Sequence, residues 1–271
     1  MYDLSAKVLL WRNGKMKFKE IDEKMRVYET YADTCVLPQM YIVARLDGRS
    51  FTRLTKEVCQ YEAPFDDRFR DLMVSTTRSL MQCGFDVVFG YTQSDEISLL
   101  LGRDERAFGR KLRKLNSVLA GEASSHFSIA LGKPATFDCR VSQLPNKELV
   151  CDYFRWRNQD SVRNALNAHC YWALRKSGID ARLATRRLAG MNVAKKNELL
   201  FSDLGINFND LPAWQKRGTG LYWQSYLKDA VNPKTGKNVK AKRRKICVDL
   251  NLPTKDAYSK FIASLCCNSD D

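Results

Sequence analysis

The chain of 271 residues is long enough to form one large domain or two modest ones. Its 45 lysines and arginines outnumber its 31 acidic residues, and the formal net charge of +14 favours a polyanionic partner. No apolar run is long enough to span a membrane, and the N-terminus lacks the pattern of a signal peptide. Nine cysteines without a CxxC pair and only two histidines argue against a zinc site or a disulfide framework, so we expect a reduced, cytoplasmic protein.

The first half of the chain alternates strand-like and helix-like segments. The apolar run at 40–47 predicts a buried strand, and residues 64–83 begin with proline and aspartate, two signals of a helix N-terminus. The patterns that follow predict a hairpin (85–92 and 96–101), a long helix (104–131) and a further strand (136–142). The order β-α-β-β-α-β is typical of an α+β, ferredoxin-like sheet with both helices on one face.

The second half is richer in helices and in basic residues. Apolar residues at helical spacing predict one long helix and two shorter ones, and two short strand-like runs follow. These elements are 146–176, 180–189, 192–201, 218–224 and 245–250. Residues 231–245 hold seven basic residues and no acid, which predicts a mobile loop.

Three carboxylates gather at one end of the predicted sheet. Asp47 ends the first strand, and Asp95 and Glu96 lie where the hairpin turns. Because the first strand lies beside the hairpin in this topology, Asp47 and Asp95 should come within a few ångströms of each other. Two such carboxylates repel unless a hard cation neutralises them, and Mg²⁺ prefers oxygen ligands. Two ions about 3.5–4 Å apart would suit phosphoryl transfer. The glycine turn after Asp47 could cradle a triphosphate, although both motifs also fit ordinary turns.

Six segments carry a family resemblance: RLDGRSFTRLTK (45–56), GYTQSDEISLLL (90–101), FDCRV (137–141), DYFRWRNQD (152–160), KKNELLF (195–201) and LPAWQKRGT (211–219). Together they resemble the tRNA-His guanylyltransferase family and its bacterial, archaeal and phage-type relatives, the 3′–5′ polymerases. The resemblance implies a polymerase-like palm that adds nucleotides to the 5′ end of tRNA. A 5′-monophosphate would first be activated with ATP or GTP, and the 3′-hydroxyl of an incoming nucleotide would then attack.

The resemblance also implies how the chain is organised. We expect residues 1–144 to form the palm-type catalytic region, after a short N-terminal extension. Residues 145–271 would form a helical, basic region packed on it, in one continuous domain. Because family members are tetramers, we expect a homo-oligomer, a tetramer by resemblance.

Carried over residue by residue, the resemblance assigns the metal site to Asp47, Asp95 and the carbonyl of Gly48, which would hold two Mg²⁺ ions. It makes Lys196 a catalytic support near the triphosphate. ATP and GTP would be substrates, and Asp66 would contact a nucleotide base. The nucleotide-binding residues that it implies are Gly48, Arg49, Ser50, Phe51, Thr52, Asp66, Ser94 and Glu96.

A tRNA partner is implied as well, and basic side chains suit its phosphates. Ser161 stands where eukaryotic family members have the histidine of HINNLYN, a residue associated with strict tRNA-His function. This departure favours templated repair of 5′-truncated tRNAs over obligatory G−1 addition. The expected tRNA contacts are Arg103, Arg110, Lys111, Arg113, Lys114, Arg157, Arg163, Asn164, Asn167, Lys216, Arg217, Lys242, Arg243 and Arg244.

Two other functions remain open. A nucleotide cyclase-type palm shares the two-acid metal site, but it would not need the helical and basic second half. A non-catalytic RNA-binding module on a ferredoxin-like sheet shows aromatic residues on its exposed strands, whereas the carboxylates here would repel phosphate without a metal. We expect Trp156, Trp172 and Trp223 to lie in the core or a subunit interface, and His126 and His169 to be structural.

Overall fold

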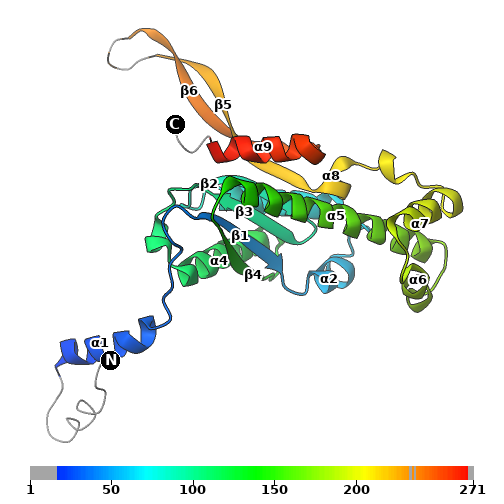
Figure 1. Cartoon of the computed structure of the whole chain (residues 1–271), viewed down its shortest axis with the longest axis horizontal. Coiled ribbons are helices and arrows are strands. Elements are labelled where there is room, and N and C mark those ends of the chain that lie inside the picture. Colours follow the sequence, from blue (N-terminus) through cyan, green and yellow to red (C-terminus); the bar gives the residue numbers. More distant parts are fainter. Residues whose placement is uncertain (1–16, 232–233, 235, 268–271) are drawn as a thin grey trace, which may run out of the picture.

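The computed structural model describes residues 17–231, 234 and 236–267. In that part of the chain, six antiparallel strands form one sheet in the order β4-β1-β3-β2-β5-β6 (Figure 1). The first four keep the order predicted for a ferredoxin-like sheet, so the α+β fold class is confirmed. The strands are β1 (Tyr41–Gly48), β2 (Val87–Gln93), β3 (Glu96–Leu101), β4 (Phe137–Leu144), β5 (Thr219–Val231) and β6 (Asn238–Asp249).

Helices α3 (Asp67–Leu80) and α4 (Leu112–Leu131) pack together against one face of the sheet. Ile42, Ala44 and Leu46 alternate along β1 and are buried in one core with both helices. Both helices therefore lie on one face, as the periodicity of the sequence predicts.

Helices α5 (Lys147–Lys176) and α9 (Lys255–Cys267) cover the opposite face of the sheet (Figure 1). Val43 of β1, Phe154 of α5 and Ile262 of α9 are buried there in a second core. Since helices cover both faces, the central strands are apolar almost throughout. The polar residues Asp47, Gln93 and Glu96 lie at the strand ends.

The helices differ from the prediction at several places. Helix α4 begins at Leu112 and not at residue 104, because Phe108 and Gly109 of the preceding 3₁₀ turn (Ala107–Arg110) have positive φ angles of 53° and 61°. Helix α9 was not predicted, and neither was α1 (Phe18–Thr30), which has no buried residue. Among the residues described, no helix combines the length and the apolar character that crossing a bilayer requires.

Short helices surround the C-terminal half of α5 beyond the end of the sheet (Figure 1). Leu166 of α5 is buried there in a third core with Leu188 and Leu200. The helices α2 and η2, which follow β1, lie toward the same end of the sheet. These elements are α2 (Phe51–Arg53), η2 (Leu54–Val58), α6 (Ala181–Leu188), α7 (Val193–Glu198), η4 (Leu199–Asp203), η5 (Phe208–Asp210) and α8 (Ala213–Arg217).

Residues 232, 233 and 235 of the predicted mobile loop at 231–245 lie outside the described residues. The prediction is wrong for residues 238–245, because β6 begins at Asn238. Its residues pair with β5 from Lys245 opposite Gln224 to Asn238 opposite Val231. Strand pairing uses main-chain hydrogen bonds and does not require apolar side chains. The charged sequence of this segment therefore gave no signal of a strand. We call residues 224–231 and 238–245 the arm, since they extend past the body of the sheet (Figure 1).

Candidate active site

Two carboxylates meet at the end of the sheet where β1 stops and the β2–β3 hairpin turns. Asp47 is the penultimate residue of β1, and Asp95 lies in the turn just before β3. The backbone N–H of Gly48 donates to the carbonyl oxygen of Asp95 at 3.0 Å and ties the turn to the end of β1. The topology thus brings together the two residues that the sequence singled out. We call Asp47 and Asp95 the acid pair.

The acid pair carries negative charge that no neighbour neutralises. Burial and the charge of Asp47 raise the pKa of the Asp95 carboxyl. Within the described residues, neither carboxylate forms an ion pair, and no group of three or more His, Cys, Asp and Glu side chains is placed to hold a metal. Two carboxylates with a nearby backbone carbonyl suit Mg²⁺, which takes its other ligands from water and from substrate phosphates. The residues present therefore fit such an ion.

The segment after β1 turns sharply beside the acid pair. Ser50 has a positive φ of 62° and caps α2, while the N–H of Arg49 donates to the carbonyl of Thr136 at 2.9 Å. Phe51 is buried, with its ring centroid 4.9 Å from that of Phe137. Because the ring of Phe51 is packed in the core and holds the turn in place, only the backbone of Phe51 could contact a phosphate. Arg49, Ser50 and Thr52 are exposed.

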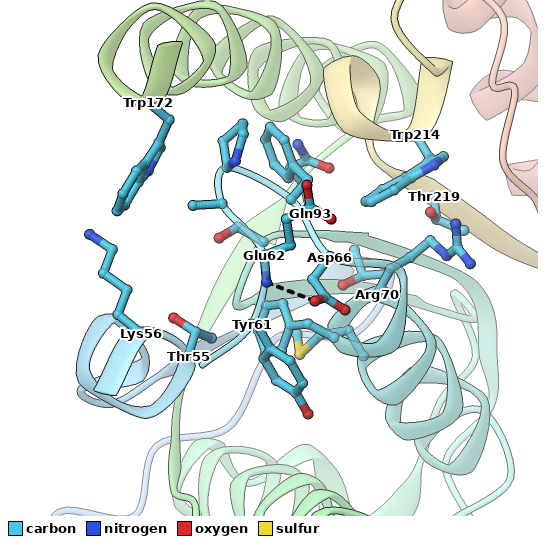
Figure 2. A pocket seen from close by; sticks show the side chains of 17 residues that line it. Thr55, Lys56, Tyr61, Glu62, Asp66, Arg70, Gln93, Trp172, Trp214 and Thr219 are labelled. Carbon is cyan, nitrogen blue, oxygen red and sulfur yellow. Dashed lines mark hydrogen bonds between the residues drawn. The ribbon is translucent and has the colours of Figure 1, made fainter. Parts of the chain in front are cut away.

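A pocket opens beside the acid pair (Figure 2). It lies between helix α3 and the end of β2 on one side and helices α5 and α8 on the other. Its empty volume is about 670 Å³, which includes the open space at its mouth. Ser94, the neighbour of Asp95, lies in its wall. Other lining residues are Thr55, Lys56, Tyr61, Glu62, Phe65, Asp66, Phe69, Arg70, Gln93, Trp172 and Trp214.

Sequence reasoning missed most of this pocket. Trp172 was predicted for the core or a subunit interface, but it is half-buried and faces the pocket, where the ammonium of Lys56 lies 5.0 Å from its ring centroid. Trp214 lines the opposite side, with the guanidinium of Arg70 against its ring. These residues come from separate segments, and no spacing in the sequence joins them.

Asp66 lies in the pocket wall, as its expected contact with a nucleotide base requires. Its carboxylate caps α3 by accepting from the backbone N–H of Arg68, and it also accepts from the N–H of Glu62 at 2.8 Å. The guanidinium of Arg68 donates to both oxygens at 2.6 and 3.0 Å. These bonds hold the pKa of Asp66 far below its usual range. Most of its hydrogen-bonding capacity therefore serves the fold.

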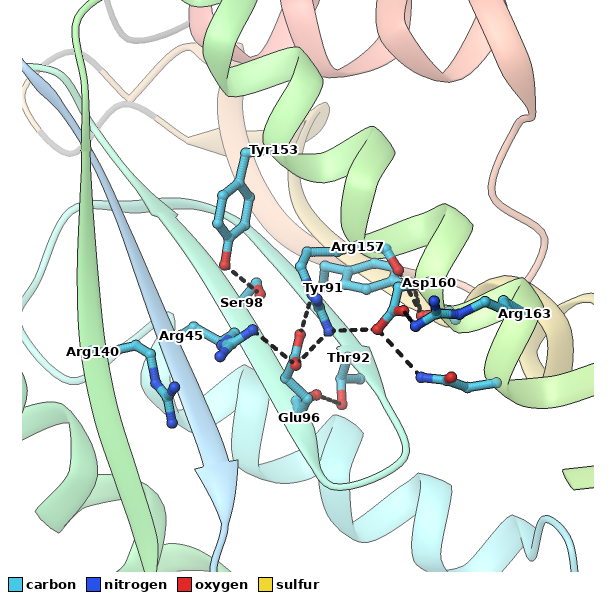
Figure 3. A network of polar contacts seen from close by, with 12 residues as sticks. Arg45, Tyr91, Thr92, Glu96, Ser98, Arg140, Tyr153, Arg157, Asp160 and Arg163 are labelled. Carbon is cyan, nitrogen blue, oxygen red and sulfur yellow. Dashed lines mark hydrogen bonds and ion pairs between the residues drawn. The ribbon is translucent and has the colours of Figure 1, made fainter. Parts of the chain in front are cut away.

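Glu96, which the resemblance assigned to nucleotide binding, faces α5 (Figure 3). Its carboxylate pairs with Arg157 of α5 and with Arg45 of β1. Burial raises the pKa of Glu96, and the charge of Arg157 opposes that rise. Arg157 was expected to contact tRNA, but its side chain is buried and paired, which removes it from the surface that phosphates could reach.

Ser161 lies on the same helix, α5, and is buried. Its hydroxyl lies 2.7 Å from the hydroxyl of Tyr91, and both residues are buried. Ser161 is therefore an interior residue of α5. Arg163 and Asn164 are exposed one turn further on, and both contact the carboxylate of Asp160. Their position is compatible with the tRNA contact expected of them.

Lys196 lies beside the C-terminal half of α5. Its ammonium donates to Oδ1 of Asn167 at 2.8 Å, and in the described part of the chain it forms no ion pair with the acid pair. Its expected catalytic role would require it to leave Asn167 for a bound triphosphate. Two expected tRNA contacts on α8 are engaged as well: Lys216 with the carbonyl of Asn209 at 2.6 Å, and Arg217 with Asn251 at 2.8 Å.

The basic residues at 103–114 lie at the opposite end of the sheet from the acid pair. Arg110 donates to the carbonyls of Met40, Arg103 and Glu105, so its guanidinium is committed to the fold and is not free for RNA. Other members of this group are also engaged: Lys111 and Arg113 pair with Asp33, Arg103 lies over Tyr41, and Lys114 lies over Phe108. This end of the molecule is too far from the acid pair to contact the reacting nucleotide.

The remaining basic residues, Lys242, Arg243 and Arg244, are exposed on the arm, and Arg244 stacks over Trp223. The two histidines are structural, as predicted. His126 bonds to Ser75, and burial lowers the pKa of His169 to about 4, which leaves it neutral at pH 7.

Comparisons with known proteins give a consistent family. The model described as tRNAHis guanylyltransferase matches residues 22–145, and the one described as Thg1 C terminal domain matches residues 148–254. The mouse (Mus musculus) protein named "Probable tRNA(His) guanylyltransferase" is 35% identical over 223 residues, which cover 79% of this chain and 74% of that protein.

Solved structures agree. A bacterial tRNA(His) guanylyltransferase (Thg1)-like protein in complex with ATP is 28% identical, with a TM-score of 0.72 over 90% of this chain and 98% of that one. A bacterial Thg1-like protein in complex with GTP is 26% identical, with a TM-score of 0.67 over 91% of this chain and 98% of that one.

Proposed function

The chain belongs to the tRNA(His) guanylyltransferase family, and from this premise we propose that it adds nucleotides in the 3′–5′ direction to the 5′ end of tRNA. The observation that carries the proposal is the acid pair at the end of the sheet, beside a pocket lined by Trp172 and Trp214. Relatives that bind ATP and GTP support both nucleotides as substrates. A tetrameric assembly and a cytoplasmic location stay predictions.

We propose that Asp47, Asp95 and the carbonyl of Gly48 would hold two Mg²⁺ ions. Bound there, the ions would supply Lewis-acid stabilisation of the phosphates and of the attacking hydroxyl. The acid pair would fix them at the end of β1, and the exposed turn at Ser50 would receive the triphosphate on its backbone groups. No histidine base is needed, which agrees with the buried position of His169 and the hydrogen bond of His126 to Ser75.

The reaction would proceed in two steps. A 5′-monophosphorylated tRNA would first attack ATP or GTP and release pyrophosphate. The 3′-hydroxyl of an incoming nucleotide would then attack the activated 5′ end and release the nucleoside monophosphate. Phosphoryl transfer of this kind depends on positioning, which the pocket would provide, and on charge neutralisation, which ions held by the acid pair would provide.

We further propose that the substrates are 5′-truncated tRNAs, repaired by templated addition. Ser161, in place of the family histidine, supports this choice. To test this, the protein is incubated with ATP, the four nucleotides and Mg²⁺ and with one of two 5′-monophosphorylated RNAs. One RNA is tRNA-His without G−1, and the other is another tRNA without its first nucleotide. We expect the templated base on the truncated tRNA. Extension of tRNA-His alone would contradict repair, and extension of neither RNA would contradict catalysis.

Replacing Trp172 by alanine should raise the Kd for ATP about tenfold, because stacking of a base on an aromatic ring contributes about 1–3 kcal/mol. The ring faces the pocket and is held by Lys56. Calorimetric titration with a non-hydrolysable ATP analogue measures the effect. Phe201→Ala is the matched control, because Phe201 is 64% exposed and lies outside the pocket lining. Equal Kd values for Trp172→Ala and the wild-type protein would exclude Trp172 from base binding.

The arm should contribute to tRNA affinity through phosphate contacts. Replacing Lys242, Arg243 and Arg244 together by glutamine should reduce the slope of log K against log salt concentration by about 2–3, because each phosphate contact contributes about 0.9. Fluorescence anisotropy of labelled tRNA over a range of KCl concentrations measures the slope. A charge-matched control replaces the exposed residues Lys19, Lys24 and Arg26 of α1. Equal slopes for the two triple variants would contradict a specific role for the arm.

A further inference from the structure

We propose that Arg157 is a positioning residue: it holds Glu96 away from the acid pair, so that the cation site is built from two carboxylates and not from three. This inference rests on the proposed function of Asp47 and Asp95 as cation ligands. It assigns Arg157 a role different from the tRNA contact that the sequence predicted.

Glu96 is close enough to the acid pair to need such control. It follows Asp95 directly, and it stands opposite Asp47 in the β1–β3 register. Side chains of directly opposed residues share one face of a sheet, with Cβ atoms about 4.5–5.5 Å apart. An unpartnered carboxylate at this position would repel Asp47 or join it on a shared cation. Asp138 faces Asp47 from the other side, and there Arg140 holds it at 3.2 Å.

Arg157 donates hydrogen bonds to both carboxylate oxygens of Glu96 (Figure 3). Its Nε donates to Oε1 at 2.8 Å and its Nη2 to Oε2 at 2.7 Å, while Nη1 of Arg45 lies 3.6 Å from Oε2. A bidentate pair of this kind fixes the orientation of a carboxylate as well as its charge. The Glu96 carboxylate is therefore held toward α5.

Arg157 is itself held rigidly. Only 9% of the residue is exposed, its guanidinium lies 4.6 Å from the ring centroid of Trp156, and Nη2 lies 3.3 Å from Oδ2 of Asp160. With Arg45, Glu96 and Arg163, which also pairs with Asp160, this cluster has three positive and two negative charges and needs no cation. The acid pair next to it has no such partner among the described residues. A bound cation would therefore go to Asp47 and Asp95.

Binding of Mn²⁺ to the nucleotide-free protein, measured by electron paramagnetic resonance, tests the inference. In Arg157→Met, Glu96 is released toward the acid pair, and we expect Mn²⁺ to bind about tenfold more tightly through the third carboxylate. Adding Glu96→Gln to that variant should restore the wild-type Mn²⁺ affinity. Arg155→Met is the matched control on the same helix, since Arg155 is exposed and, among the residues described, pairs only with Asp152.

Steady-state kinetics separate positioning from tRNA contact. In Arg157→Met we expect kcat to fall about ten- to a hundredfold, with the KM for tRNA unchanged. Arg157→Lys keeps the charge but cannot engage both oxygens, so it should lie between Arg157→Met and the wild-type protein in kcat and in Mn²⁺ affinity. This variant also keeps the test decisive if Arg157→Met does not fold.

The outcomes distinguish the inference from its premise. If Asp95→Asn binds Mn²⁺ as tightly as the wild-type protein does, the proposed cation site is wrong. If Asp95→Asn weakens binding but neither Arg157 variant strengthens it, the acid pair stands and the positioning role is overturned. A raised KM for tRNA with unchanged kcat would contradict the positioning role and support a contact between Arg157 and tRNA.

Discussion

Replacing Asp95 by asparagine should lower kcat for nucleotide addition by at least about a thousandfold without unfolding the protein. The substitution removes one of the two carboxylates proposed to hold the metal ions. It also removes a charge that the fold does not favour, because burial and Asp47 raise the pKa of Asp95. A carboxyl group with a raised pKa contributes stability below its ordinary pKa and loses that contribution as the pH rises through the raised value. Once ionised, Asp95 is therefore a cost to the fold, and the asparagine variant should have a Tm equal to or above that of the wild-type protein.

Two measurements on the same preparation check this expectation. Single-turnover extension of a 5′-truncated tRNA gives the rate, and thermal unfolding at pH 7 in the presence of EDTA gives the stability without metal. Asp152→Asn is the control, because Asp152 is an exposed carboxylate on α5 that pairs with Arg155. If the Asp95 variant loses activity only together with its fold, the acid pair is structural.

The sheet could be predicted because its central strands are buried on both faces. Such strands are continuous apolar runs, and the residues that end them are conspicuous in the sequence. The same rule explains why the arm was missed. Residues 238–245 are paired through their backbones to one neighbouring strand only, and their side chains carry no signal of burial. Helix α9 was missed because its contacts with the sheet are tertiary, as with Ile262 in the second core.

The acid pair could be predicted because Asp47 and Asp95 end neighbouring elements of a recognisable topology. The pocket could not, because Lys56, Trp172 and Trp214 reach it from three distant segments. Arg157 illustrates a different limit. A charged residue on a helix is normally exposed, and only the packing of α5 over β3 reveals that Glu96 compensates its burial. The sequence therefore predicted the proposed metal ligands, Asp47 and Asp95, better than it predicted the residues that surround and position them.

Gly48→Ala should lower kcat/KM about a hundredfold, because a displacement of about 1 Å at a reacting centre has effects of that size. A Cβ atom at this position would lie 2.5 Å from Cγ of Phe51 and 2.7 Å from its Cδ atoms. The ring cannot retreat, since its centroid is 5.1 Å from that of Phe127 and 4.9 Å from that of Phe137. The backbone must move instead, and it carries Asp47 on one side and the turn at Ser50 on the other. Overpacking of this kind should also lower the free energy of unfolding by about 1–3 kcal/mol.

Urea unfolding and steady-state kinetics measure the two effects, and two further variants separate their causes. Gly121→Ala is the matched control, because its Cβ meets open space in the middle of α4, and helix propensity predicts a gain of up to about 1 kcal/mol. The double variant Gly48→Ala/Phe51→Leu gives the new methyl group room and should recover part of the lost stability. If it recovers none, the clash with Phe51 is not the cause. If stability returns while kcat/KM stays low, the turn needs the Phe51 anchor for catalysis as well as for folding.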